Sequence, residues 1–150
     1  MSKNVVWFLT LVFLISGCRS EDTLSPNSFR GTYVLDQANA KPLPLLLSDS
    51  PPWRYTLLAE TLTFEGEGRV TRARTIREEN SATGVIKITP MSFNQGFRID
   101  HSSVEIGSFT PCAPNALCIA NDTGVVLGET IALLSNQYNR AELTYKRAGQ

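Results

Sequence analysis

From residue 29 onward, apolar and polar side chains alternate with a period of two along most of the chain. The first example is Phe29, Gly31, Tyr33 and Leu35, which share one face of an extended segment. Such alternation is typical of a β-strand with one buried face. We therefore expect about eight to ten short strands, although the stretch 129–138 also allows one or two helical turns. The β-prone segments after the first lie at 43–47, 55–64, 69–77, 84–89, 96–100, 103–109, 116–120, 125–134 and 140–146.

Turn-forming residues separate these segments. Asn39–Pro42 and Ser48–Pro52 interrupt the alternation, and Glu65–Gly68 indicates a hairpin because it joins two β-prone runs. Pro42 and Pro44 cannot donate a backbone hydrogen bond, so the segment around them is expected to be an edge strand or an extended crossing. Short strands joined by such turns predict an all-β antiparallel meander that closes into a small barrel, with a β-sandwich as the alternative.

The N-terminal segment has a different pattern. An apolar run of 11 residues, 5–15, follows the cationic Lys3 and is followed by small residues, which is the layout of a signal peptide. A membrane-spanning helix needs roughly 20 apolar residues, and the polar residues from Arg19 onward end this run too early. We therefore expect an exported protein.

The end of that run, Ile15-Ser16-Gly17-Cys18, resembles the lipobox of bacterial lipoproteins. The resemblance implies a signal peptide at 1–17 and a mature chain whose first residue, Cys18, carries the lipid that anchors it in the bilayer. Because Arg19 is not an aspartate, the same resemblance favours the outer over the inner membrane. Residues 18–28 then form a flexible tether with a reach of some 15–20 Å, and residues 29–150 form one domain. The alternative is an ordinary signal peptide cut near Gly17, with no lipid.

Charge and cysteine content narrow the function. Without Lys3, the mature chain has 13 basic and 14 acidic residues, and this balance argues against a nucleic-acid partner. With Cys18 assigned to lipid, Cys112 and Cys118 remain as an even pair, for which a disulfide is the default outside the cytoplasm. A redox pair or a metal site is the alternative, but the spacing is not Cys-x-x-Cys and His101 is the only histidine.

The run 31–35, the Lys41–Pro44 segment and the Thr-Leu-Thr-Phe hairpin resemble small lipocalin-like lipoprotein domains of bacteria. In larger lipocalins an opening Gly-x-Trp packs near a late arginine at the base of an up-and-down barrel. Gly31, Tyr33 in place of tryptophan, and Arg147 occur in that order here. The resemblance implies a lipocalin-like barrel over 29–147 that binds a small apolar or anionic ligand and catalyses no reaction.

Three residues are candidates for ligand binding. Arg72 and Arg74 share a strand face with Val70 and Ile76, and guanidinium groups in a barrel mouth would bind a carboxylate or phosphate. The favoured interpretation instead places both arginines on the solvated outer face, with Thr and Ala packed inward. Trp53 follows Ser-Pro-Pro; it is either an aromatic side chain at a binding rim or, as favoured, one that covers the edge of the core.

Catalytic motifs are missing from the sequence. Asp100, His101 and Ser102 are sequence neighbours, whereas a catalytic triad is assembled from separate segments. The chain has no nucleophile elbow and no phosphate-binding glycine loop. We therefore expect a non-enzymatic envelope lipoprotein without metal or cofactor, which binds a small ligand or, as the alternative, another envelope protein through a domain with a filled core.

Overall fold

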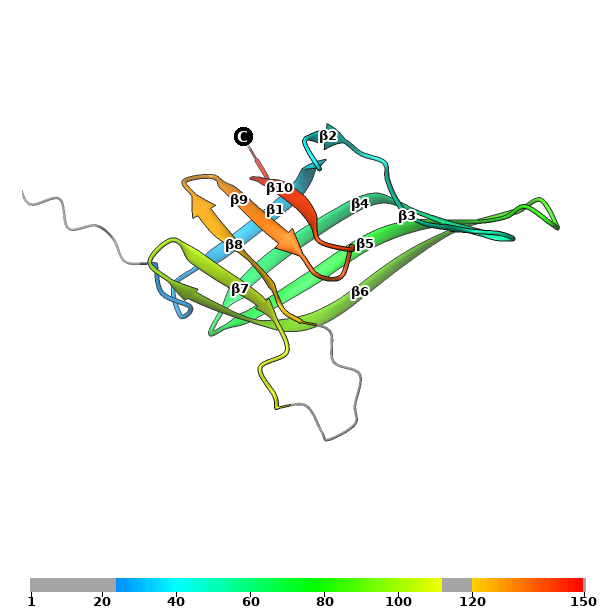
Figure 1. Cartoon of the computed structure of the whole chain (residues 1–150). Coiled ribbons are helices and arrows are strands. Elements are labelled where there is room, and N and C mark those ends of the chain that lie inside the picture. The colour runs from blue at the N-terminus through cyan, green and yellow to red at the C-terminus, as the bar shows by residue number, and fades with distance from the viewer. Residues whose placement is uncertain (1–23, 112–119, 150) are drawn as a thin grey trace, which may run out of the picture.

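The computed structural model describes residues 24–111 and 120–149. Cys18, Cys112 and Cys118 lie outside these ranges, so their lipidation and disulfide pairing stay predictions. The described residues form β-strands, turns and loops and contain no helix (Figure 1). The strands are β1 (Arg30–Ala38), β2 (Lys41–Pro42), β3 (Leu45–Ser50), β4 (Trp53–Gly66), β5 (Arg69–Asn80), β6 (Val85–Asp100), β7 (Ser103–Gly107), β8 (Asp122–Leu127), β9 (Thr130–Ser135) and β10 (Ala141–Arg147).

Eight of these strands form a closed antiparallel barrel. Strands β4 to β10 follow one another as a meander, and β1 pairs with β10 on one side and with β4 on the other, which closes the ring. Strands β2 and β3 are additions at the margins, on β1 and β4 respectively. The predicted all-β meander and its closure into a small barrel are confirmed, and the β-sandwich alternative is wrong.

Some strand boundaries differ from those predicted. The segments 84–89 and 96–100 belong to one strand, β6, and the segment 125–134 is divided into β8 and β9 by a turn at Gly128. The helical alternative for 129–138 is wrong, because its first part is β9 and its last part a turn. The segment near Pro44 forms β3, whose described partner is β4 alone, as expected for an edge strand.

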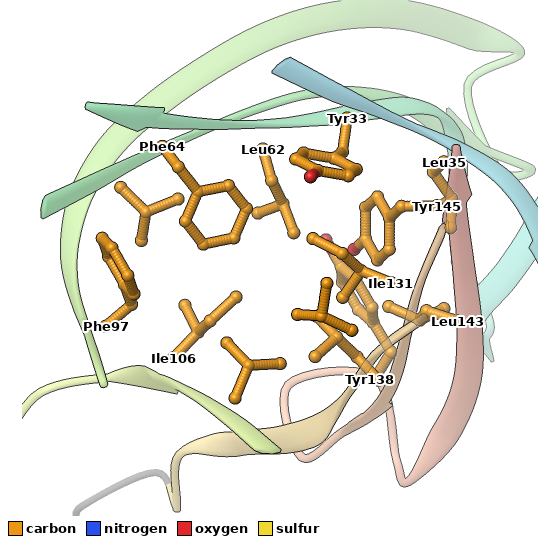
Figure 2. Packing of buried hydrophobic residues seen from close by; sticks show 14 of the residues in the cluster. Tyr33, Leu35, Leu62, Phe64, Phe97, Ile106, Ile131, Tyr138, Leu143 and Tyr145 are labelled. Carbon is orange, nitrogen blue, oxygen red and sulfur yellow. The ribbon is translucent and has the colours of Figure 1, made fainter. Parts of the chain in front are cut away.

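The barrel interior is occupied by a cluster of buried apolar side chains (Figure 2). Four aromatic rings pack at one end, with Phe64 edge-on to Phe29 and Phe97 at centroid distances of 4.8 and 5.0 Å. Each fully buried side chain of this size stabilises the fold by about 1.5–3 kcal/mol relative to exposure. Tyr33 is the fourth ring, 5.7 Å from Phe64 between centroids. The other buried apolar residues include Leu35, Leu62, Ile106, Ile131, Leu143 and Tyr145.

The aromatic end of the barrel is also the end at which the described chain begins. Pro26 accepts a hydrogen bond from the backbone N–H of Gly68 in the β4–β5 turn. Arg147 extends over Gly31, where an added Cβ would lie 3.2 Å from its Nε. Because glycine has no Cβ, the backbone at residue 31 can approach the guanidinium of Arg147 this closely; a larger residue here would crowd it.

Strands β3 to β6 continue well past the other end of the barrel (Figure 1). We call this projection, residues 45–56 and 77–90, the arm. Its two hairpin tips are joined by a hydrogen bond of 2.8 Å from the N–H of Ser81 to the carbonyl of Pro52. Along β4, the 12 residue-to-residue steps from Trp53 at the tip to Glu65 at the barrel base span about 40 Å. The arm therefore extends away from the end at which the described chain begins.

Candidate functional site

Arg72 lies inside the barrel. Its side chain is fully buried, on the same face of β5 as Val70 and Ile76. The favoured interpretation, an arginine on the solvated outer face, is therefore wrong for this residue. The reason is that acidic side chains from β4 and β8 neutralise it, and one of them, Asp122, is 50 positions away in the sequence.

Two carboxylates contact the Arg72 guanidinium. Its Nη2 donates to Oδ2 of Asp122 at 2.7 Å, and its Nε lies 3.6 Å from Oε1 of Glu60. Asp122 also accepts hydrogen bonds from the Ser135 hydroxyl at 3.0 Å and the Asn136 backbone N–H at 2.7 Å. Burial alone would lower the pKa of Arg72, but the charges of Glu60 and Asp122 outweigh it, so the pKa is raised and the guanidinium stays charged.

Glu60 is held by two tyrosines as well. The hydroxyls of Tyr138 and Tyr145 both donate to its carboxylate. Burial, followed by the negative charge of Glu60, raises the pKa of each phenol above its usual value near 10. Both phenols therefore stay protonated and keep donating. The network explains why an acidic residue occupies the apolar face of the predicted strand 55–64.

Arg74 also faces the interior, at the barrel end nearer the arm. Its Nη1 donates to the Tyr138 hydroxyl at 3.2 Å, and its guanidinium lies 5.0 Å from the centroid of the Phe93 ring. The side chain is partly buried, so the outer-face interpretation is wrong here too. With Glu60 and Asp122 opposite Arg72 and Arg74, the formal charges of the network cancel, and its contacts link β4, β5, β8 and β10.

Trp53 stands at the tip of the arm, 42% exposed, with its ring stacked on that of Tyr55 at a centroid distance of 6.3 Å. The favoured interpretation, a side chain that covers the core, is wrong because β4 carries this residue past the barrel. Trp53 lines a hollow of about 380 Å³ together with Arg54, Glu79 and Ile86. It is therefore accessible to a binding partner.

The outward face of the arm combines exposed apolar side chains on its edge strands, β3 and β6, with charged side chains on β3, β4 and β5. Leu46, Thr56, Arg77 and Ile88 form one row across the four strands, and Asp49, Arg54, Glu79 and Ile86 form the next. Leu46 is 53% exposed, Ile86 57% and Ile88 59%. The charged side chains pair with one another: Arg54 donates to Asp49 at 2.7 Å and Arg77 donates to Glu79 at 2.6 Å. The hydrogen bond from Arg54 lowers the pKa of Asp49.

A second hollow, of about 330 Å³, lies where the arm joins the barrel. Its lining includes the small residues Ala59, Ala73 and Thr75 and the ring of Pro90. Because these side chains on β4 and β5 are small, the outer surface of the sheet is recessed at this point. The arm and its base therefore present a hollowed surface whose exposed apolar groups lie along its edges.

No protein-family model, curated protein or solved structure matches this chain. The other sequence candidates are placed apart from the arm. His101 has its Nδ1 2.8 Å from Oδ1 of Asp100 in an exposed turn between β6 and β7. Within residues 24–111 and 120–149, no group of three His, Cys, Asp or Glu side chains is placed to hold a metal ion. The same ranges contain no helix long and apolar enough to cross a membrane.

Sequence reasoning missed Asp122, Tyr138 and the arm, and it did not place Glu60 inside the barrel. Glu60 carried a local signal, since it interrupts an apolar strand face, and Arg72 lies on a face with Val70 and Ile76. Opposite charges on two such faces are a signal for a buried pair. The arm had no comparable signal, because its strands alternate in the same way as those of the barrel.

Proposed function

We propose that this protein is an exported lipoprotein of the bacterial cell envelope that is anchored through an acylated Cys18. Its barrel supports the arm, and the arm is a docking surface for another envelope protein. The observation that carries the proposal is the exposed apolar edge of the arm, with Val85, Ile86 and Ile88 each more than half exposed. Exposed apolar groups gathered in one region mark interaction sites on soluble domains.

The barrel interior supports docking over binding of a small ligand. Ligand pockets usually measure hundreds of Å³ and lie in a concave, preformed site. Here the centre of the barrel is occupied by the apolar cluster and by Arg72 with its two carboxylates. A non-enzymatic role is part of the proposal, since Asp100 and His101 share an exposed turn in place of a closed site.

The direction of the arm supports the same role. The described chain begins beside the β4–β5 turn, and the arm tip lies at the far end of β4. A lipid on Cys18 would hold the first of these ends near the bilayer, because the tether reaches only some 15–20 Å. The arm would then extend from the membrane towards a partner.

Site-specific photo-crosslinking in intact cells tests the docking surface. A photoreactive residue at Ile86 is expected to crosslink to a discrete envelope protein. The same residue at Leu127, an exposed apolar position on β8 outside the arm, is the matched control and is expected to give no such product. Crosslinks from neither position, or equal crosslinks from both, would reject the arm as the docking surface.

Fractionation of the same cells tests the anchor separately. The wild-type protein is expected in the membrane fraction, and Cys18→Ser is expected to lose the lipid and accumulate in the soluble periplasmic fraction or as an uncleaved precursor. A lipid mass on the wild-type N-terminal peptide would identify the modification. Unchanged membrane association of Cys18→Ser, with no lipid mass on the wild type, would reject lipid anchoring.

A further inference from the structure

One edge of the arm has no strand beside it. Strand β6 pairs with β5 from Val85 to Gly96, but its other side pairs with β7 only from Gly96 to Asp100. Within the described residues, the side of 85–95 that faces away from β5 therefore has no strand partner. A row of unpaired N–H and C=O groups is a template for another extended chain.

Pro90 indicates which residues direct their backbone groups to this edge. Proline has no N–H, so within a sheet it occupies edge positions whose N–H would face away from the neighbouring strand. Pro90 is opposite Thr75 of β5 in the middle of β6. Backbone direction alternates along a strand, so Ile86 and Ile88 share the orientation of Pro90. Their N–H and C=O groups are therefore available to an added strand.

The side chains at this edge define the chemistry of that strand. Ile86 and Ile88 expose apolar side chains on the outward face. Lys87, between them, faces the other way and is exposed, and no ion pair of Lys87 occurs within the described residues. Glu78, the residue opposite Lys87 on β5, accepts a hydrogen bond from Thr89 instead. Along this edge the exposed side chains are therefore apolar at Ile86, cationic at Lys87 and apolar again at Ile88.

We propose that Val85–Thr89 accepts an extended segment of the partner protein as an additional antiparallel strand, and that this segment alternates apolar and acidic residues. Main-chain hydrogen bonds to Ile86 and Ile88 supply affinity, and an acidic side chain opposite Lys87 supplies selectivity, as in other cases of strand addition. This inference rests on the docking role proposed for the arm, and it names the class of partner segment.

A second copy of this chain fits the edge less well. Pairing two copies with Ile86 opposite Ile88, which matches apolar with apolar side chains, places Lys87 opposite Lys87. Like charges directly opposite one another on neighbouring strands are destabilising. Lys87 therefore disfavours pairing between two copies of this chain and favours pairing with an acidic strand. The same charge attracts one partner and repels the other.

Peptide binding to the full-length protein in detergent micelles tests the inference. The probe is the fluorescein-labelled peptide Ser-Thr-Val-Glu-Val-Thr-Ser, and its counterpart has lysine in place of glutamate. Fluorescence anisotropy is expected to show binding of the acidic peptide, with the basic peptide about threefold or more weaker because Lys87 attracts the glutamate of one peptide and repels the lysine of the other. Protection of the Ile86 and Ile88 amides from hydrogen exchange would report the main-chain pairing.

Three variants separate the edge from the rest of the arm. Ile88→Pro removes a donor on the free side and is expected to weaken the acidic peptide by about tenfold or more, since one missing hydrogen bond and a steric block act together. Lys87→Glu leaves the backbone unchanged and is expected to reverse the preference between the two peptides. Leu46→Lys, in the same row on the opposite edge, is the matched control and is expected to leave both affinities unchanged. Circular dichroism checks that each variant is folded.

The outcomes distinguish this inference from the docking role. No binding of the acidic peptide, equal binding of both peptides, or sensitivity to Leu46→Lys in place of Lys87→Glu would overturn strand addition at β6. Crosslinks from Ile86 in cells would then still support the arm as a docking surface. Conversely, edge-specific peptide binding without crosslinks in cells would keep the strand-accepting edge and reject an envelope partner.

Discussion

Arg72 on β5 and Asp122 on β8 form a fully buried ion pair across the barrel, with 2.7 Å between Nη2 and Oδ2. The two residues are 50 positions apart in the sequence. An isolated charge in such surroundings would be very unfavourable, whereas a pair with further hydrogen bonds is tolerated. The Ser135 hydroxyl and the Asn136 N–H supply those further bonds to Asp122. The pair therefore fixes the position of β5 relative to β8.

Arg72→Met is expected to destabilise the protein by about 3–5 kcal/mol, because it leaves Glu60 and Asp122 buried without their cation. Urea unfolding followed by circular dichroism measures this. The control is Arg69→Met, which removes an exposed pair with Glu67 and is expected to change stability by less than about 0.5 kcal/mol. Equal effects of the two variants would show that the buried network contributes no more than a surface ion pair.

The tyrosines that donate to Glu60 predict a loss of stability at alkaline pH. The folded-state pKa values of Tyr138 and Tyr145 are raised, first by burial and then by Glu60, whereas tyrosine in the unfolded chain ionises near pH 10. The unfolded state therefore loses these protons first. Their contribution to stability is complete below about pH 10 and falls above it by up to about 1.4 kcal/mol per group per pH unit.

Urea unfolding at several pH values between about 9 and 11 measures this slope. Tyr145→Phe is expected to lower stability at neutral pH by about 1–3 kcal/mol, because Glu60 loses a donor, and to flatten the alkaline decline. Tyr138→Phe combined with it should flatten the decline further. A decline as steep in the double variant as in the wild type would assign the alkaline loss to other groups.

The strand pattern could be predicted from the sequence because each barrel strand has one buried face. The run Phe29, Gly31, Tyr33 and Leu35 illustrates this, and the Glu65–Gly68 hairpin is predictable because its turn residues join two such runs. Barrel closure depends on the pairing of β1 with both β4 and β10. That pairing joins residues that are distant in sequence. The alternation of side chains therefore allows either a closed barrel or a β-sandwich and does not decide between them.

The buried network could not be derived from local pattern in the same way. An arginine on a strand with Thr and Ala on its other face is expected to face solvent, because burial of one charge is unfavourable. Arg72 is inside because Glu60 and Asp122 meet it from other strands. The arm was missed for a related reason. Ile86 and Ile88 follow the alternation of a buried strand, and only the tertiary structure shows that β6 has left the barrel there.

Gly124 on β8 predicts a steric effect. An added Cβ would lie 1.9 Å from the carbonyl oxygen of Ala132 and 2.8 Å from the Cα of Leu133, both on β9. Gly124→Ala must therefore push two backbones apart and is expected to cost about 3 kcal/mol or more. The control is Gly128→Ala, where the cost is about 1 kcal/mol because φ is +60° but no atom lies within 4 Å. Thermal unfolding should rank the two variants in this order.

The arm predicts a contrast between exposed and buried isoleucines. The double variant Ile86→Lys/Ile88→Lys is expected to change the free energy of unfolding by less than about 0.5 kcal/mol, because both side chains are more than half exposed outside the barrel. Ile106→Ala, by comparison, removes a fully buried side chain and is expected to cost about 2–5 kcal/mol. Urea unfolding of both variants tests the contrast. If the lysine pair destabilises the protein as much as Ile106→Ala, the two isoleucines contribute to folding and the arm is packed against the domain. If stability is kept while crosslinking from a photoreactive residue at the neighbouring exposed Val85 is lost, these apolar groups serve binding, which is the property that separates a docking surface from an extension of the core.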